Sequence, residues 1–247
     1  MTFQVFLFFL LQESTKREIN FYEESIDDMY SHCKDKMEKM VFEKYAKELT
    51  EEGYGKHWKN EEKKINKEIK ILTSLELQAI RVYTENKNNV YLDFNSAVRT
   101  GKNTYGTSFK FHILHFLLAS ALQKLKRADN GSCYITYRRD KSEYKKLPNK
   151  IRFGSFSSSS LTADQKDYGN ETCFKIETCL GAKLEQYSAY PEEKEVLIPP
   201  YEVFTFVEEE VPELKDCKTV YLSSTCQLND IIMSRFLLCL IFLILLL

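Results

Sequence analysis

Hydrophobic residues follow a helical repeat in the first half of the chain. Between Cys33 and Leu49, apolar side chains recur every four residues, at Met37, Val41 and Tyr45. This spacing places them on one face of an amphipathic helix. Residues 59–84 continue as a highly charged helical stretch, and residues 109–127 place Phe111, Leu114, Leu118, Leu122 and Leu125 on one side of another helix.

From residue 128 onward the hydrophobic period changes from that of a helix to that of a strand. The segment "CYITYRR" (133–139) alternates between two faces, as a strand does. The segments 150–161, 173–180, 195–211 and 217–224 are further strand candidates. Helices followed by strands, without βαβ alternation, predict a single α+β domain.

The composition argues against several classes of binding function. The 247 residues include 35 Lys and Arg against 36 Asp and Glu, which does not favour a nucleic-acid partner. Only eight glycines are present, and they form neither a dinucleotide fingerprint nor a P-loop.

Both ends of the chain are apolar. The start, "MTFQVFLFFLL", resembles the core of a secretory signal (1–18). The apolar part of the tail (231–247) is shorter than the roughly 20 residues that span a bilayer, and it predicts a signal exchanged for a GPI anchor. A buried terminal helix or a short membrane anchor are the alternatives. The domain between them covers residues 19–230.

The cysteines agree with export. Cys239 lies in the tail, which leaves six for a disulfide framework in the domain. No pair has C-x-x-C spacing, and apart from His32, next to Cys33, no histidine lies near them, so we expect no metal. Sequons at Asn130 and Asn170 fit a secreted glycoprotein.

Three segments carry candidate chemistry. In "YPEEKEVLIPPYEVF" (190–204), Glu193 and Glu195 flank a lysine; in an extended segment both would face one cleft, although surface strands often show such pairs. Arg138 ends a predicted strand and could clamp a phosphate or form a structural salt bridge. The serine run 157–160 is not a nucleophile elbow, so it is a positioning element or a polar strand.

An arginine, a serine run and E-x-E on successive strands after a helical half resemble the Arg-Ser-Glu class of mono-ADP-ribosyltransferases. The resemblance is greatest to the vertebrate ecto-enzymes that modify protein arginine, and it covers residues 19–228. The segments "SIDDMYSHC", "YLDFNSAVRTG", "FKFHILHFLLASAL", "CYITYRR", "RFGSFSSSSL" and "EEKEVLIPPYEVF" carry it, the last being the most specific. It implies a split β-sandwich around an NAD cleft.

The resemblance implies a role for each site residue. Arg138 would contact the phosphates or ribose of NAD, with Tyr137 and Arg139 beside it in the cofactor site. Ser158 would hold the nicotinamide ribose and orient the catalytic acid. Glu195 would bind the ribose 2′-hydroxyl and stabilise the oxocarbenium ion, and Glu193 would steer the incoming guanidinium.

The resemblance also implies a protein contact and a set of disulfides. Tyr187 and its neighbours would meet the target protein. The disulfides would be Cys33–Cys226 and Cys133–Cys179, which leaves Cys173 and Cys217 as an extra pair.

Two residues depart from the family pattern. Arg139 stands where the family usually has glycine, and it would either obstruct the phosphate or add a second contact to it. Ser159 replaces the customary threonine.

The expected protein is a monomeric, lipid-anchored or secreted enzyme. It would transfer ADP-ribose from NAD to arginine on cell-surface or secreted proteins, without a metal. An NAD glycohydrolase and a catalytically silent surface protein are the alternatives.

Overall fold

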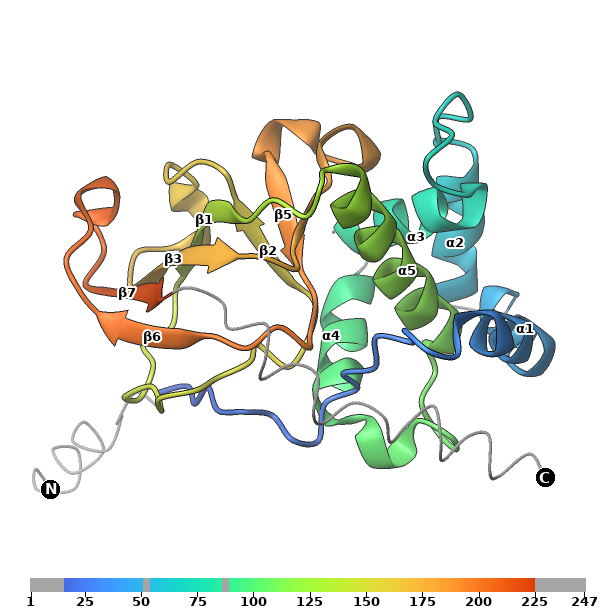
Figure 1. Cartoon of the computed structure of the whole chain (residues 1–247), viewed down its shortest axis with the longest axis horizontal. Helices are drawn as coiled ribbons and strands as arrows, with labels where there is room; N and C mark the ends of the chain where they lie inside the picture. The colour runs from blue at the N-terminus through green and yellow to red at the C-terminus, as the bar shows by residue number, and fades with distance from the viewer. Residues whose placement is uncertain (1–15, 51–53, 86–88, 225–247) are drawn as a thin grey trace, which may run out of the picture.

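Helices and strands occupy separate halves of the protein in the computed structural model (Figure 1). The structure describes residues 16–50, 54–85 and 89–224. The predicted tail and Cys226 lie outside these residues, as does most of the predicted signal. Within the described part of the chain, no helix is long and apolar enough to cross a membrane. The predicted order of a helical half followed by a strand-rich half is confirmed.

Five α-helices form the first half: α1 (Lys34–Lys44), α2 (Tyr54–Glu62), α3 (Ser74–Thr84), α4 (Val90–Thr100) and α5 (His112–Ala128). Two predicted helices are shorter than expected. The helix over 33–49 ends at Lys44 and gives way to a 3-10 turn, and the stretch 59–84 is not helical between α2 and α3. A new helix begins there because Thr73 and Glu76 form a capping box, with the Thr73 hydroxyl accepting from the Glu76 amide at 3.2 Å.

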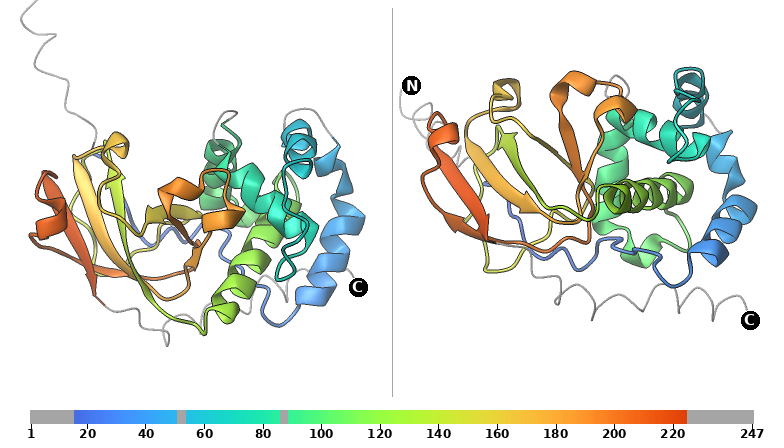
Figure 2. Two further views of the ribbon diagram at one scale, coloured as in Figure 1. Left: turned by 90° about the horizontal axis from the view of Figure 1, so that it is seen from above. Right: turned by 45° about the horizontal axis from the view of Figure 1, so that its top comes forward.

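Helix α5 is the centre of the helical half. It packs against α1, α3 and strand β4 (Ala182–Lys183), and Figure 2 shows it between the strands and the outer helices. Ile113, Leu114, Leu118 and Leu122 are fully buried, and so is His115. A helix covered on several sides buries more than the single apolar stripe that its sequence predicts.

The second half is one seven-stranded sheet in the order β4-β5-β2-β1-β3-β7-β6. Its other strands are β1 (Tyr134–Asp140), β2 (Ser157–Ser160), β3 (Thr172–Thr178), β5 (Glu195–Ile198), β6 (Thr205–Glu208) and β7 (Thr219–Ser224). Neighbouring strands are antiparallel except for β3 and β7, which are parallel.

The sheet is weakly joined between β1 and β2. These strands share one registered pair, Tyr137 with Ser160, whereas β1 pairs with β3 over all of its seven residues. The sheet therefore opens at this join into a part containing β4, β5 and β2 and a part containing β1, β3, β7 and β6. This opening is where the expected cleft would lie.

Several strand predictions were too long. The segment 150–161 is a strand only at Ser157–Ser160, and the segment 195–211 is divided into β5 and β6. Gly154 breaks the first because its φ is +67° and an added Cβ would lie 2.5 Å from the Tyr22 ring. Pro199 and Pro200 end β5, since proline cannot donate to the ladder.

Two disulfides follow the implied pairing. Cys133 is bonded to Cys179 at one end of β1 and β3, and Cys173 is bonded to Cys217. Cys33 is also disulfide-bonded. Its implied partner, Cys226, lies outside the described residues.

Candidate active site

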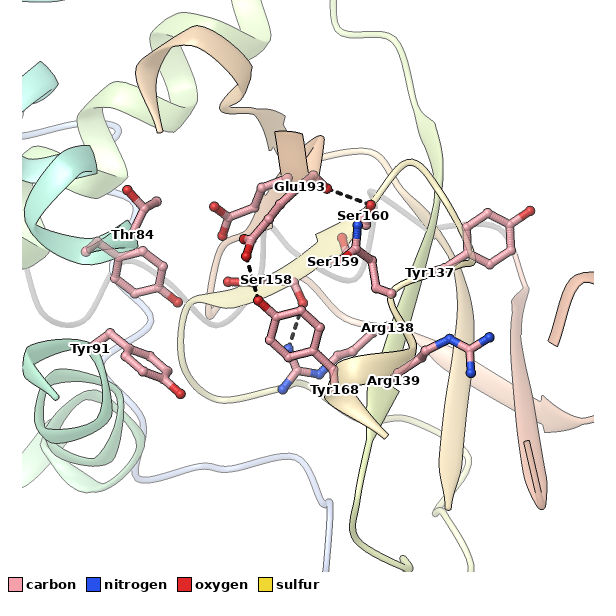
Figure 3. A pocket seen from close by; sticks show the side chains of 13 residues that line it. Thr84, Tyr91, Tyr137, Arg138, Arg139, Ser158, Ser159, Ser160, Tyr168 and Glu193 are labelled. Carbon is pink, nitrogen blue, oxygen red and sulfur yellow. Dashed lines mark hydrogen bonds between the residues drawn. The ribbon is translucent and has the colours of Figure 1, made fainter. Parts of the chain in front are cut away.

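A pocket opens where β1 and β2 diverge, and it brings the predicted site residues together. Arg138 from β1, Ser158 from β2 and Glu195 from β5 line it, together with Glu193 from the turn before β5. The opposite wall comes from the helical half. The pocket thus lies between the two halves of the domain (Figure 3).

Arg138 supplies a positive charge to the pocket. It is half-buried, and its Nη1 donates to the Ser158 carbonyl oxygen at 2.6 Å. The guanidinium also lies over the Phe153 ring, 5.8 Å from the centroid. The hydrogen bond to the Ser158 carbonyl oxygen in β2 fixes one side of the planar guanidinium and leaves further N–H donors for an anionic ligand.

Only one serine of the run directs its hydroxyl toward Glu195. Ser157, Ser159 and Ser160 each donate to a backbone carbonyl, of Ser155, Val196 and Glu193 respectively. The Ser158 hydroxyl instead faces Tyr83 and Glu195 in the pocket. The strand is therefore a positioning element whose pocket-facing member is Ser158.

Glu195 is a buried carboxyl at the start of β5, with 5% of its surface exposed. Burial raises its pKa to about 7, and the nearby negative charge of Glu193 adds to the effect. The Ser158 hydroxyl and the Arg138 guanidinium oppose it by favouring the charged form. A pKa displaced this far in a pocket is typical of a functional carboxyl.

Glu193 reaches the same pocket by a different backbone path from the one expected. The sequence predicted an extended E-x-E segment, but Glu193 ends a 3-10 turn and Lys194 has a left-handed φ of 48°. The turn is held in place because the Ser160 hydroxyl donates to the Glu193 carbonyl oxygen at 2.7 Å. Both glutamates line the pocket even though the extended conformation was wrong.

Arg139 also lines the pocket, but its guanidinium points away from the other candidate residues (Figure 3). It forms two hydrogen bonds of 3.0 Å to the carboxylate of Asp216, and its Nε donates to the Ala163 carbonyl oxygen at 2.8 Å. The phosphate contact considered for Arg139 is therefore not supported, because this carboxylate already neutralises its charge. Its neighbour Tyr137 lines the pocket as well, and its hydroxyl donates to Glu213 at 3.1 Å.

The loop before Glu193 is fastened to α3. The Arg81 guanidinium donates to the Ser188 carbonyl oxygen at 3.3 Å, and the Ala189 amide donates to the Thr84 hydroxyl at 2.9 Å. Tyr187, expected to meet the target protein, is half-buried and packs against the helical core.

Sequence patterns did not reveal the helical wall of the pocket. Tyr83, Thr84 and Tyr91 line it from α3 and α4, and Gln165 and Tyr168 line it from the loop between β2 and β3. The Tyr83 hydroxyl donates to the Phe156 carbonyl oxygen at 3.0 Å, and burial raises its pKa well above the usual value. The sequence indicated a charged helical stretch here, and helical periodicity does not say which strand a residue of such a helix meets.

The described residues contain one group of side chains with the spacing of metal ligands, Cys133, Glu177 and Cys179. The two sulfur atoms are bonded to each other in a disulfide. A disulfide sulfur is not a thiolate, so this group lacks the ligands that a zinc ion prefers.

Residues 19–229 match the family model of NAD:arginine ADP-ribosyltransferase. The chain belongs to this family. The resemblance inferred from the arginine, serine and E-x-E segments is thereby confirmed.

Curated relatives of this ADP-ribosyltransferase chain include vertebrate ecto-enzymes. Human ecto-ADP-ribosyltransferase 4 is 36% identical over 209 residues, 78% of this chain and 65% of that protein. Human ecto-ADP-ribosyltransferase 5 is 43% identical over 136 residues, 51% of this chain and 47% of that protein. Chicken erythroblast NAD(P)(+)–arginine ADP-ribosyltransferase is 32% identical over 192 residues, 73% of this chain and 64% of that protein. The chain thus spans between about half and two thirds of the length of these relatives.

Solved structures of ADP-ribosyltransferases share the fold. A mutant of the eukaryotic mono-ADP-ribosyltransferase ART2.2 in complex with NADH has a TM-score of 0.72 at 26% identity, covering 85% of this chain and 94% of that one. A second ART2.2 mutant, in complex with NAD, has a TM-score of 0.71 at 27% identity, with the same coverage.

Proposed function

We propose that this protein is a mono-ADP-ribosyltransferase that transfers ADP-ribose from NAD to arginine side chains and releases nicotinamide. The observation that carries the proposal is the meeting of Arg138, Ser158 and Glu195, from three strands, in one pocket. Family membership and the ART2.2 complexes with NAD and NADH support NAD as the substrate. No metal is required.

Each of the pocket residues has a separate role in the proposed reaction. Arg138 binds the phosphates or ribose of NAD, with Tyr137 beside it, and Ser158 orients the ribose and the catalytic acid. The bond between C1′ and the nicotinamide nitrogen breaks, and nicotinamide leaves as a neutral base with the bonding pair. The Glu195 carboxylate stabilises the positive charge that develops at C1′, which lowers the barrier because the charge is greatest in the transition state.

Glu193 selects the acceptor. A guanidinium nitrogen of the target arginine forms the new bond to C1′, and its proton passes to the Glu193 carboxylate. The products are ADP-ribosylarginine, nicotinamide and one proton. If water attacks C1′ instead, the products are ADP-ribose, nicotinamide and one proton, which is the glycohydrolase alternative.

The setting that we propose is the cell surface or the extracellular space. The "ecto" names of the relatives, the disulfides Cys133–Cys179 and Cys173–Cys217, and the apolar ends of the chain support export and a lipid anchor. The sequon residues Asn130 and Asn170 are exposed, as glycosylation requires. The acceptors are arginine-bearing surface or secreted proteins, met by the loop around Tyr187, and the enzyme acts as a monomer.

Labelled NAD with agmatine, a small guanidino compound, tests the activity. We expect agmatine to be labelled by the wild-type protein, Glu195→Gln to abolish both transfer and nicotinamide release, and Glu193→Ala to lose labelling while NAD hydrolysis continues. Glu192→Ala, an exposed neighbour, is the matched control.

Three results would contradict the proposal. Nicotinamide release without labelled agmatine would make the protein a glycohydrolase. Equal loss of both reactions in Glu193→Ala would show that its role is misassigned. A protein with no turnover, in which Glu195→Gln changes nothing, would be a silent surface protein.

A further inference from the structure

Tyr168 makes a contact with Glu193 that neither the sequence nor the proposed mechanism assigns. Its hydroxyl donates to Glu193 Oε1 at 2.7 Å, although the two residues belong to different loops. Tyr168 is 49% exposed, so it lies at the mouth of the pocket. Figure 3 shows its ring below Glu193 with the hydroxyl directed at the carboxylate.

The Glu193 carboxylate depends on this contact for its orientation. The Ser160 hydroxyl holds the backbone carbonyl of Glu193, not its side chain. Among the residues that the structure describes, Tyr168 is the one whose hydrogen bond holds the carboxylate group of Glu193. Without it, a half-buried glutamate can turn toward solvent, since its side-chain torsions are otherwise free.

The loop that carries Tyr168 is fastened at both ends by Arg139. This guanidinium donates to the carbonyl oxygens of Ala163, at 2.8 Å, and Gly169, at 3.5 Å, on either side of the 3-10 turn Lys166–Tyr168. Arg139 also pairs with Asp216. The residue after Asp216, Cys217, is disulfide-bonded to Cys173 in β3, and this bond holds Asp216 close to Arg139. The residue that replaces the expected glycine thus keeps Tyr168 over the pocket.

We propose that Tyr168 is a positioning residue that orients the Glu193 carboxylate toward the acceptor guanidinium and so sets the partition of ADP-ribose between arginine and water. This inference rests on the proposed transferase function. The phenol occupies one carboxylate oxygen, and the other is left to accept a guanidinium N–H and its proton. Water needs no such alignment, so hydrolysis depends less on Tyr168 than transfer does.

The experiment measures two rates in the full-length protein with labelled NAD: agmatine labelling, and nicotinamide release without agmatine. Tyr168→Phe removes the hydroxyl and keeps the ring. We expect labelling to fall about tenfold more than hydrolysis, the effect of one hydrogen bond to a charged group, with the KM for agmatine raised and that for NAD little affected. Arg139→Gly, which releases the loop, should shift the partition in the same direction.

Tyr91→Phe is the matched control, because it deletes a hydroxyl from the opposite wall of the pocket. Whatever it does to the overall rate, it should leave the ratio of transfer to hydrolysis unchanged. Near-UV circular dichroism verifies that each variant is folded.

The outcomes separate the two proposals. If the wild type labels agmatine and Tyr168→Phe has the wild-type ratio, the positioning role is wrong and the proposed function stands. A parallel loss of both reactions in Tyr168→Phe would mean that Tyr168 acts on NAD instead. If the wild type releases nicotinamide but labels no agmatine, both proposals fail.

Discussion

Arg138 and Arg139 are consecutive in β1, yet their guanidinium groups bind on different sides of the strand. Arg138 donates to the Ser158 carbonyl oxygen at 2.6 Å in the pocket, and Arg139 forms two 3.0 Å hydrogen bonds with Asp216 away from it. Successive side chains of a strand point to opposite faces, so neighbouring arginines have different tasks. Arg138 supplies a positive charge to the pocket, and Arg139 holds the loop that carries Tyr168.

The Arg139–Asp216 pair predicts an asymmetry in stability. The Arg139 side chain is 2% exposed and that of Asp216 is 35% exposed. Asp216→Ala would leave a buried cation without its carboxylate, whereas Arg139→Ala would leave an anion that water can solvate. We therefore expect Asp216→Ala to lower the free energy of unfolding in urea more than Arg139→Ala does.

The double variant sharpens this test. Once the buried cation is removed, loss of Asp216 should cost little, so Arg139→Ala/Asp216→Ala should resemble Arg139→Ala. Lys166→Ala is the control, because the Lys166 ammonium is exposed and 3.9 Å from Asp216. A larger loss for Arg139→Ala than for Asp216→Ala would contradict the argument.

The pKa of Glu195 predicts how turnover depends on pH. Burial raises this pKa to about 7, so the carboxylate that stabilises the developing cation is partly protonated at neutral pH. We expect kcat/KM for NAD to fall about tenfold per pH unit below that value and to level off above it. A profile that is flat between about pH 5 and 8 would contradict this assignment.

A variant of Glu193 tests the origin of that pKa. The Glu193 charge disfavours ionisation of Glu195, as burial does. Glu193→Gln should therefore lower the apparent pKa of NAD hydrolysis, because it removes a neighbouring negative charge. An unchanged or higher apparent pKa would mean that the two carboxyl groups do not interact.

For the E-x-E segment, the sequence pattern predicted the shared location of the two glutamates but not the backbone conformation. The sequence predicted one cleft for Glu193 and Glu195, and both line one pocket. The extended backbone was wrong because the left-handed Lys194 and the Ser160 contact depend on β2, which is more than 30 residues away in the chain. Hydrophobic periodicity carries no information on such contacts.

Strand alternation and helix periodicity likewise do not show which elements of the fold meet one another. Alternation implies that Arg138 and Arg139 face opposite sides, but it does not say which side is the pocket. The tyrosines of the helical wall, Tyr83 and Tyr91, come from α3 and α4, and helical periodicity does not say which strands such residues face. The order of a helical half followed by a strand-rich half and the three motif segments were predictable, whereas β4, the division of 195–211 into β5 and β6, and the packing of the helical half onto the sheet were not.

Glu195→Gln should stabilise the protein at alkaline pH. The carboxyl ionises near pH 4.5 in the unfolded chain and near 7 in the folded one, so the folded state binds more protons between these values. Wild-type stability from this group is complete below pH 4.5 and lost as pH rises through 7, by about 3 kcal/mol in all.

The measurement is urea unfolding of wild type and Glu195→Gln across that pH range. The amide has no charge to bury, so the variant should be more stable above pH 7, and the difference should vanish as pH falls toward 4.5. Glu192→Gln, at an exposed position, should show no such trend. A variant that is less stable than wild type at pH 8 would show that the carboxylate is stabilised by its surroundings instead.

His115 predicts the opposite pH dependence in the helical core. Its side chain is fully buried in α5, where Nδ1 lies 2.7 Å from the Tyr30 hydroxyl and Nε2 lies 3.2 Å from the Ile26 carbonyl oxygen. In the neutral ring Nε2–H donates to that carbonyl, and Nδ1 accepts from Tyr30, whose oxygen lies 3.1 Å from that of Tyr105. A second proton would take the acceptor from Tyr30.

The pKa of His115 is lowered to about 4, chiefly by burial and also by the nearby His112, although the Ile26 carbonyl and Asp27 oppose the shift. The unfolded chain binds this proton near pH 6.5, so stability falls as pH drops from 6.5 toward 4, with a slope of about 1.4 kcal/mol per pH unit from this residue.

His115→Gln keeps a donor and an acceptor but cannot be protonated. Its unfolding free energy should therefore have a shallower slope in this range, whatever its absolute stability. Equal slopes in wild type and His115→Gln would mean that another group governs acid unfolding.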